Sequence, residues 1–571
     1  MKVLHGVWCL SLACLVVVCA GFLLNDAGAP APGAPPTFAT ANQITHDGLT
    51  KTALLSDGSA LYVAEEKAGH QVISKIDPRT GSQSTVSTPF PDVRALDVSP
   101  DQKSLLASPT RAGERTGELW TIPLNQVASS RMGDLTAGDA AWAPNGEDLV
   151  SVKGHEIWIT STKGLAGKKV AELKGRPFRP RFSPDGQTIR FSVSDIETNA
   201  SVLWEVGKDG SNLHEMLAGW SKEHGVCCGV WSKDGKSYIF QTTPRWPVMI
   251  AMLWAMPGNG EGEPKQLTEG PMSFGSPWPA ESDKIWALGV KPLGEVVKYD
   301  PVHETVSKVL SGVSATDVDF SPDGKWATYV SVPDGALWRS RSDGSERTQL
   351  TFGGERVVLP HWSPDSKQIA YVSTKTGEPS RIMLIGVDGG KPAPVYVEKY
   401  GQIDINWAPD GKRMMYGTIY GTPEMSIRIL DLKAQAITKI PGSDKVYSPR
   451  WSPDGRYIAA LSLDMKSVML YEFQTQKWTT WAKEPAGSVS YPTWSKDSKY
   501  LYFDDMITDE ETIRRVKVGE DHPERVFGVR GIEHYMGPWG YWSGQMLDGS
   551  YMFVQDRSSQ EVYSLNLGVS K

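Results

Sequence analysis

The chain has 571 residues, a formal net charge of −7, and 22% charged against 40% hydrophobic residues. This length exceeds what one hydrophobic core organises, so we expect more than one domain. The mild acidity provides no basic face, which argues against nucleic-acid binding. Of the five cysteines, three lie in an N-terminal apolar segment and two are adjacent, which excludes a fold held by a framework of disulfides.

An apolar segment runs from Val7 to Leu24. Its 18 residues are just enough to span a bilayer as a helix, and they exceed the about 7–15 apolar residues of a usual signal peptide. We therefore expect one apolar helix within residues 1–24 that anchors the chain in a membrane, with a cleaved signal peptide as the alternative. Both export the rest of the chain. Residues 25–42, rich in Ala, Gly and Pro, are expected to be a flexible spacer.

A short phrase, an aromatic residue followed by Ser-Pro-Asp-Gly or a variant of it, recurs along almost all of the remaining chain. Its first and last copies are 491 positions apart, which over eleven steps gives about 45 residues per repeat. A four-stranded propeller blade has about 40–45 residues, so we predict an all-β fold of about twelve four-stranded blades. The copies centre on Asp57, Asp101, Asn145, Asp185, Asp234, Asp283, Asp323, Asp365, Asp410, Asp454, Asp497 and Asp548.

Residues 361–390 show the strands of one repeat. His361-Trp362 ends a first strand, and Ser363 to Ser366 form a turn in which Ser and Asp side chains bond backbone amides. Gln368 to Ser373 alternates as a second strand, Arg381 to Val387 is the third, and Asp388-Gly389 is a hairpin signal before the fourth. The motif aspartates are therefore interpreted as turn caps rather than as a row of ligands.

Eight tryptophans stand at the first position of the motif or its equivalent, and we expect them to pack within and between blades. They are Trp142, Trp231, Trp278, Trp362, Trp407, Trp451, Trp494 and Trp542.

Twelve blades exceed the four to eight of one propeller, so we predict two six-bladed rings, residues 43–305 and 306–571. One detail stays open. The last repeat ends soon after its third strand, Glu561–Leu567, and the strand-like piece Gln43-Ile44-Thr45 precedes the first repeat. If that piece closes the last blade, the two rings are not simply sequential.

No catalytic motif occurs in the sequence. There is no G-x-S-x-G elbow, no phosphate-binding glycine loop and no H-E-x-x-H pair, and the ten histidines lack metal-ligand spacing. The chain also ends at Lys571 without room for the hydrolase domain that accompanies some propellers. We therefore predict no catalytic, cofactor-binding or metal-binding residues, no cofactor, and no enzyme.

Two local features lie outside the repeat. Cys227 and Cys228 are adjacent, and we favour buried thiols beside Trp231 over a structural disulfide between neighbours and over a redox or metal role. The acidic residues Asp504-Asp505 and 509–511 could bind a hard cation through carboxylates, but a solvated loop is the favoured interpretation.

The repeat resembles the TolB-type, WD-like β-propeller repeat with its Pro-Asp pair, over about residues 43–571. Segments such as Ser201–Leu213, Cys227-Cys228-Gly229 and Ser448–Ser462 further resemble the exported propeller region of acidobacterial CadC-like membrane transcriptional regulators. Those regulators carry a cytoplasmic winged helix before the membrane span. Met1 stands almost at the span here, so this sequence contains no winged helix and DNA binding is not carried over. Either the domain has been lost, or the true start lies upstream and encodes it.

These observations predict a non-enzymatic, exported binding or sensory module for protein, peptide or glycan ligands. Its expected location is the bacterial cell envelope, as a single-pass inner-membrane protein held by residues 7–24 with periplasmic propellers, or as a periplasmic protein after signal cleavage. The alternative is a propeller enzyme, a lyase or hydrolase with its active site on the axis. A cluster of His, Glu, Arg or Tyr that converges around a metal in one funnel would favour the enzyme, and apolar, uncharged funnels would argue against it.

Overall fold

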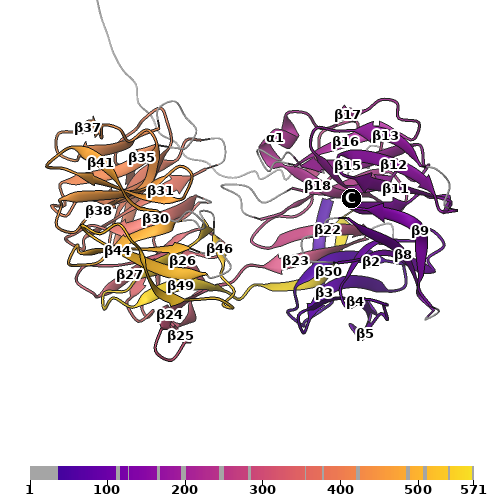
Figure 1. Ribbon diagram of the computed structural model, residues 1–571, viewed down its shortest axis with the longest axis horizontal. Coiled ribbons are helices and arrows are strands. Elements are labelled where there is room, and N and C mark those ends of the chain that lie inside the picture. The colour runs from indigo at the N-terminus through magenta and orange to yellow at the C-terminus, as the bar shows by residue number, and fades with distance from the viewer. Residues whose placement is uncertain are drawn as a thin grey trace, which may run out of the picture.

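The computed structural model describes residues 37–110, 116–125, 128–163, 167–194, 201–242, 250–280, 284–353, 355–375, 378–418, 425–483, 489–505, 511–537 and 540–568. The protein is all-β, and twelve antiparallel four-stranded sheets carry the described chain. The sheets form two propeller-like rings that lie side by side (Figure 1). The predicted fold class is confirmed in this form, whereas the predicted apolar helix lies outside the described residues.

The first ring contains five blades built from consecutive strands and one composite blade. Its innermost strands β2, β6, β10, β14, β18 and β22 contact one another in this order, and β22 contacts β2 to close the ring. The blades are β2–β5 (Lys51–Ser56, Leu61–Lys67, His70–Ile76, Gln83–Thr85), β6–β9 (Val93–Val98, Ser104–Pro109, Gly117–Pro123, Ser130–Ala137), β10–β13 (Asp139–Trp142, Asp148–Lys153, Glu156–Ser161, Lys168–Glu172), β14–β17 (Arg176–Phe182, Thr188–Ser194, Ser201–Gly207, His214–Glu215), β18–β21 (Val226–Trp231, Ser237–Thr242, Leu253–Pro257, Lys265–Gln266), and β22, β23, β50 and β1 (Ser273–Pro279, Lys284–Lys291, Ser559–Gly568, Thr37–Gln43).

The second ring repeats this plan. Its innermost strands β26, β30, β34, β38, β42 and β48 contact one another in this order, and contacts between β24 and β26 close the ring. The blades are β26–β29 (Ala315–Phe320, Trp326–Ser331, Leu337–Arg341, Thr348–Gln349), β30–β33 (Arg356–Trp362, Gln368–Thr374, Arg381–Gly386, Gly389–Pro394), β34–β37 (Gln402–Trp407, Arg413–Thr418, Ile427–Asp431, Ala436–Lys439), β38–β41 (Val446–Trp451, Tyr457–Ser462, Ser467–Glu472, Lys477–Lys483), β42–β45 (Ser490–Trp494, Tyr500–Asp505, Thr512–Lys517, Glu524–Gly528), and β48, β49, β24 and β25 (Ser543–Gln545, Tyr551–Asp556, Gly294–Asp300, Thr305–Lys308).

Three short elements complete the described secondary structure. They are the helix α1 (Trp220–His224), the 3₁₀ turn η1 (Leu310–Gly312) and the two-stranded ribbon of β46 (Met536–Gly537) and β47 (Gly540–Tyr541).

The second ring is inserted into the last blade of the first ring, which differs from the predicted boundary at residues 305 and 306. The chain leaves the first ring after β23, and β50 returns to it beside β23. At the crossing the Arg557 amide donates to the Leu293 carbonyl, at 2.8 Å. Residues 294–308 therefore belong to the second ring, and residues 559–568 to the first. The sequence has no linker at this point because both crossings are short continuations of paired strands.

The open question about Gln43-Ile44-Thr45 is answered by the sheet order. Strand β1 pairs antiparallel with β50 as the fourth strand of the last blade, and the Ile44 amide bonds the Val562 carbonyl at 2.8 Å. The two ends of the described chain thus close the first ring together. Strand β1 begins at Thr37, so the C-terminal part of the predicted 25–42 spacer is a strand.

The motif residues have the predicted structural roles in the blades. In the repeat at Ser363, its hydroxyl bonds Asp365 Oδ1 at 2.7 Å, and that carboxylate accepts the Lys367 amide at 3.1 Å. The Trp362 indole donates to the Asp319 carbonyl of the preceding blade at 3.2 Å. Apolar clusters fill the spaces between neighbouring blades, as with Val358 and Ala370 against Ile405 and Met414.

Within the described ranges, no helix has the length and apolar character needed to cross a membrane. The predicted anchor, residues 7–24, lies outside those ranges.

Candidate functional site: the axial pockets of the two rings

A recurrent β-bulge shapes the axis of both rings. In eight of the twelve innermost strands, the register shifts at one residue that has a positive φ of 41° to 62°. A bulge re-aims side chains, and a left-handed φ costs a residue other than Gly about 1–3 kcal/mol. The eight residues are Arg179, Cys228 and Ser276 in the first ring, and Asp317, Leu359, Asp404, Ser448 and Tyr491 in the second. The residue type at each bulge position therefore determines which chemical groups that strand presents to the axis of the ring.

Three arginines gather around the axis of the first ring. Arg181 donates to the Leu96 carbonyl at 3.1 Å, and Arg94 donates to the Gly138 carbonyl at 3.0 Å. The Arg179 guanidinium makes no hydrogen bond or ion pair with any described residue, although its backbone amide donates to Asp139 Oδ2 at 2.8 Å. Arg179 is therefore the one of these three arginines whose guanidinium makes no hydrogen bond with a described residue.

Two aspartates lie near these arginines, and both are engaged with backbone amides. Asp97 Oδ2 accepts the Trp142 amide at 2.8 Å, and Asp139 accepts the amides of Ala140 and Arg179. Burial raises the pKa of Asp97 against the lowering effect of Arg181. Burial likewise lowers the pKa of Arg179, and the neighbouring arginines add to that effect. Three guanidiniums against two carboxylates give a formal charge of +1 at the axis.

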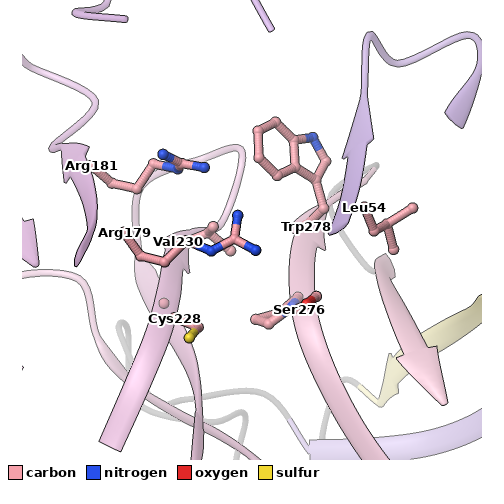
Figure 2. Close-up of a pocket in the computed structure, with 9 residues that line it drawn as sticks. Leu54, Arg179, Arg181, Cys228, Val230, Ser276 and Trp278 are labelled. Atoms are coloured by element: carbon pink, nitrogen blue, oxygen red, sulfur yellow. The ribbon is translucent and has the colours of Figure 1, made fainter. Parts of the chain in front are cut away.

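Arg179 lies between two adjoining spaces. One is a cavity of about 180 Å³, hereafter the arginine pocket, which Arg94, Asp139, Arg179 and Gln71 line together with apolar residues of β2, β3 and β6. The other, shown in Figure 2, has room for about one water and is lined by Leu54, Arg179, Arg181, Cys228, Val230, Ser276 and Trp278 among others. The two spaces together draw residues from all six innermost strands of the ring.

Trp278 packs against the apolar residues of neighbouring blades, as predicted, but it also reaches the axis. Its ring lies 5.5 Å from the Arg181 guanidinium and lines the axial space, and its indole donates to the Ser56 carbonyl at 3.1 Å. It stands two positions after the bulge residue Ser276, whereas the motif tryptophans stand three positions after theirs. Trp542 also lines an axial cavity, that of the second ring.

Cys227 and Cys228 form a disulfide, rather than the pair of buried thiols that we favoured. The Cys228 amide donates to Ser192 Oγ at 3.1 Å, which ties the bulge to the preceding blade. Cys228 lines the small space beside Arg179 (Figure 2). The disulfide is thus part of the axial surface.

The axis of the second ring holds a cavity of about 220 Å³, hereafter the acidic pocket. All six innermost strands line it, with Asp317, Asp319, His361, Arg450 and Tyr491 as its ionisable residues. His361 Nδ1 lies 3.5 Å from Asp319 Oδ2, and Arg450 pairs with Asp404 at 3.5 Å. His361 Nε2 is buried and makes no hydrogen bond with any residue that the structure describes. The two carboxylates of the lining, with Asp404 behind Arg450, outnumber the one guanidinium, so the pocket is acidic.

Burial shifts the titration of this pocket. It raises the pKa of Asp317 to about 6, although the Leu359 amide lowers it. Burial also raises the pKa of Asp404, because desolvation outweighs the attraction of Arg450. The pKa of Tyr491 is raised by burial and by the carboxylates Asp317, Asp504 and Asp404. The funnel is therefore charged and polar, so the argument that apolar funnels would make against an enzyme does not apply.

The acidic stretch at Asp504 is not a solvated loop. Asp504 and Asp505 end strand β43 and are buried, and Asp504 accepts the hydroxyls of Ser490 and Ser543. Burial raises the pKa of Asp504 to about 6. Residues 509 and 510 lie outside the described residues. Among the described residues, no group of three or more His, Cys, Asp or Glu side chains is arranged to hold a metal ion.

Parts of the chain are similar in sequence to known proteins. No family model matches the chain. It is 24% identical over 256 residues to an uncharacterized protein of Agrobacterium fabrum, 23% identical over 218 residues to the uncharacterized peptidase YuxL of Bacillus subtilis, and 27% identical over 214 residues to the Tol-Pal system protein TolB of Anaeromyxobacter dehalogenans. These matches cover 42%, 36% and 35% of this chain. The chain spans 83% of the first relative, but 32% of the second and 48% of the third.

The solved structure of TolB from Acinetobacter baumannii matches with 13% identity and a TM-score of 0.32, over 58% of this chain and 79% of that one. The sequence matches bear out the coarse prediction: the protein is a TolB-like β-propeller. The finer resemblance to CadC-like regulators stays a prediction.

Proposed function

We propose that this protein is a non-enzymatic binding module that presents two axial pockets of opposite charge to ligands of the cell envelope. The observation that carries the proposal is the distribution of residues along the blades. The motif residues are engaged in turns and blade contacts, whereas the bulge positions at the axis carry Arg179, Asp317 and Asp404. Charged groups at an otherwise regular scaffold are typical of ligand sites.

The proposed ligand is a protein, peptide or glycan, bound outside the cytoplasm. The apolar segment 7–24 supports export, with membrane anchoring as the favoured outcome and signal cleavage as the alternative. The resemblance to the exported part of CadC-like regulators supports a sensory or scaffolding ectodomain. A relative named as a component of the Tol-Pal system agrees with a role in protein assembly.

A propeller enzyme is the alternative, and two relatives are named as peptidases, YuxL and dipeptidyl-peptidase 5 of Porphyromonas endodontalis. The chain spans only 32% and 15% of these proteins. In the acidic pocket, His361 lies beside Asp319, but the pocket lining contains no Cys, and its one Ser, Ser543, donates to buried Asp504. The one Thr of the lining, Thr493, donates to the Tyr491 carbonyl at 3.4 Å, so among the described residues of this pocket no hydroxyl or thiol is hydrogen-bonded to His361.

The test is a binding screen with the full-length protein in detergent, on peptide and glycan arrays. Hits are repeated with Arg179→Gln in the first ring, Asp317→Asn in the second, and Arg79→Gln on an exposed turn as the control. We expect ligands whose binding one axial variant weakens about tenfold or more and the control leaves unchanged. Hits that neither axial variant weakens contradict an axial site, and turnover of any hit that His361→Asn abolishes contradicts a non-enzymatic role.

A further inference from the structure

We propose that the arginine pocket of the first ring binds a carboxylate group, with the Arg179 guanidinium as its main partner. This inference rests on the proposed binding function and names the ligand chemistry of one of its two pockets. It is carried by an arrangement of charges in which the Arg179 guanidinium lines a cavity and is attracted by Asp139 and Asp97, but makes no hydrogen bond or ion pair with a described residue.

Arg179 occupies the strained bulge position that recurs in the innermost strands, and this bulge aims its side chain at the axis. Its φ is 51°, a conformation that Gly adopts at least cost, and the strain persists only where surrounding contacts hold it. Asp139 provides such a contact by accepting the Arg179 amide at 2.8 Å. Asp139 thus fixes the backbone of Arg179, and no described side chain bonds or pairs with its guanidinium.

The other charged groups favour a single negative charge in the pocket. Arg94 and Asp139 line the same cavity, and Arg181 and Asp97 lie close enough to shift the pKa of Arg179. With three cations and two anions, the axis reaches neutrality on binding one monoanion. A carboxylate supplies that charge, whereas a dianion such as phosphate would leave excess charge beside Asp97 and Asp139.

Shape and donor geometry agree with this chemistry. The five N–H groups of a guanidinium form a planar fork that matches the two oxygens of a carboxylate. A protein cavity of about 150 Å³ is large enough to bind benzene. The arginine pocket, at about 180 Å³, therefore has room for a carboxylate with a short carbon chain. Ala53, Ala95 and Leu96 line the cavity and suit such a chain.

Two sources could supply the carboxylate, a free organic acid or an acidic side chain of a peptide. The experiment therefore titrates the full-length protein by calorimetry with butyrate, a monocarboxylate, and with a ten-residue alanine-based peptide that has one central Glu and blocked ends. The same peptide with Gln in place of Glu is the matched uncharged probe. Binding of butyrate alone assigns the site to small acids, and binding of both probes admits a peptide as ligand.

Substitutions test whether the Arg179 guanidinium itself binds the carboxylate. Arg179→Gln should weaken the charged probe about tenfold or more, Arg179→Lys should weaken it less because charge remains without the fork, and Arg79→Gln should leave it unchanged. Asp139→Asn keeps an acceptor for the Arg179 amide and removes a repulsive charge, so it should tighten binding. Melting temperatures confirm that each variant is folded, and Arg94→Gln replaces Arg179→Gln should the latter fail to fold.

Three results would overturn the proposal: no binding of either acid at about 10 mM, equal binding of the Glu and Gln peptides, or unchanged affinity in both arginine variants. Each of these leaves the broader binding function intact if array ligands are still weakened by Asp317→Asn in the second ring. Failure of the inference and failure of the proposed function are thus distinguishable.

Discussion

The two rings share a scaffold and differ in what they display at the axis. Each has six blades, repeated turn aspartates, and a last blade shared by distant parts of the chain. The first ring places Arg94, Arg179 and Arg181 around its axis, and the second places Asp317, Asp319 and Asp404. The repeat motif therefore specifies the blade, whereas the bulge residue and its neighbours determine which charges lie at the axis.

The largest expected effect concerns the framework, which both rings share. Trp362→Ala in the second ring and Trp231→Ala in the first remove large side chains that are 4% and 7% exposed. Each should lower the free energy of unfolding by about 3–5 kcal/mol because a cavity opens between blades. Chemical denaturation monitored by far-UV circular dichroism measures this loss. A loss below about 1 kcal/mol in either ring would show that the motif tryptophan is not a framework residue there.

The second prediction concerns how the stability of the second ring depends on pH through the buried carboxyl of Asp317. Burial raises the pKa of Asp317 to about 6 from an ordinary value of about 3.9, so the folded protein holds this proton more tightly than the unfolded chain. The contribution of Asp317 to stability is therefore full below pH 4 and is lost as pH rises through 6, by about 2–3 kcal/mol. Asp317→Asn should flatten the stability profile between pH 4 and 7. The exposed control Asp77→Asn should leave that slope unchanged, and a slope unchanged in Asp317→Asn would contradict the buried carboxylate.

The third prediction concerns the closure of the first ring. Thr45 donates to Glu561 and accepts the Val562 amide at 2.9 Å, both in buried positions, and so fastens the N-terminal strand to the C-terminal one. Thr45→Val keeps the shape and leaves these groups unpaired, at a cost of about 1–3 kcal/mol. Thr40→Val, at an exposed bond of the same strand pair, is the matched control. Hydrogen exchange should rise in β1 and β50 and stay unchanged in β26–β45; a rise confined to the second ring would contradict the shared blade.

The smallest expected effect concerns Cys227 and Cys228. A disulfide between neighbours closes a loop of two residues, so the entropic stabilisation is about 1 kcal/mol. Reduction should lower the unfolding free energy of the first ring by no more than that, and should let two further thiols react with an alkylating reagent. Intact-mass analysis of Cys227→Ala, whose Cys228 thiol is already free, provides the comparison. No reductant-dependent gain of label in the unaltered protein would contradict the bond.

The sequence predicted the blades because their signals are local. Ser363, Pro364 and Asp365 specify a turn by their own side chains, and the period of about 45 residues fixed the number of units. The insertion of the second ring into the first was indicated only by the extra strand-like segment that begins at Gln43. Pairing of β1 with β50 joins residues more than 500 positions apart, and no local pattern determines such a pairing.

The arginine cluster was missed for a related reason. Arg94 and Arg181 are far apart in the sequence, and the closure of the ring brings them to one axis. A signal was present, since seven of the eight bulge residues stand three positions before the motif aromatic, as Arg179 does before Phe182 and Asp317 before Phe320. Aligning the repeats on that aromatic residue would have gathered these seven residues in one column, although Arg94 and Arg181 fall in others.

The central claim, that axial positions carry binding and motif positions carry stability, is tested most directly by paired calorimetry. The affinity for the Glu peptide and the unfolding free energy are measured for Arg179→Gln, Asp317→Asn and Asp365→Ala. The account predicts that Arg179→Gln alone loses about tenfold or more in affinity, while Asp365→Ala loses stability with its affinity unchanged. Loss of affinity in Asp365→Ala, with Arg179→Gln binding normally, would contradict it.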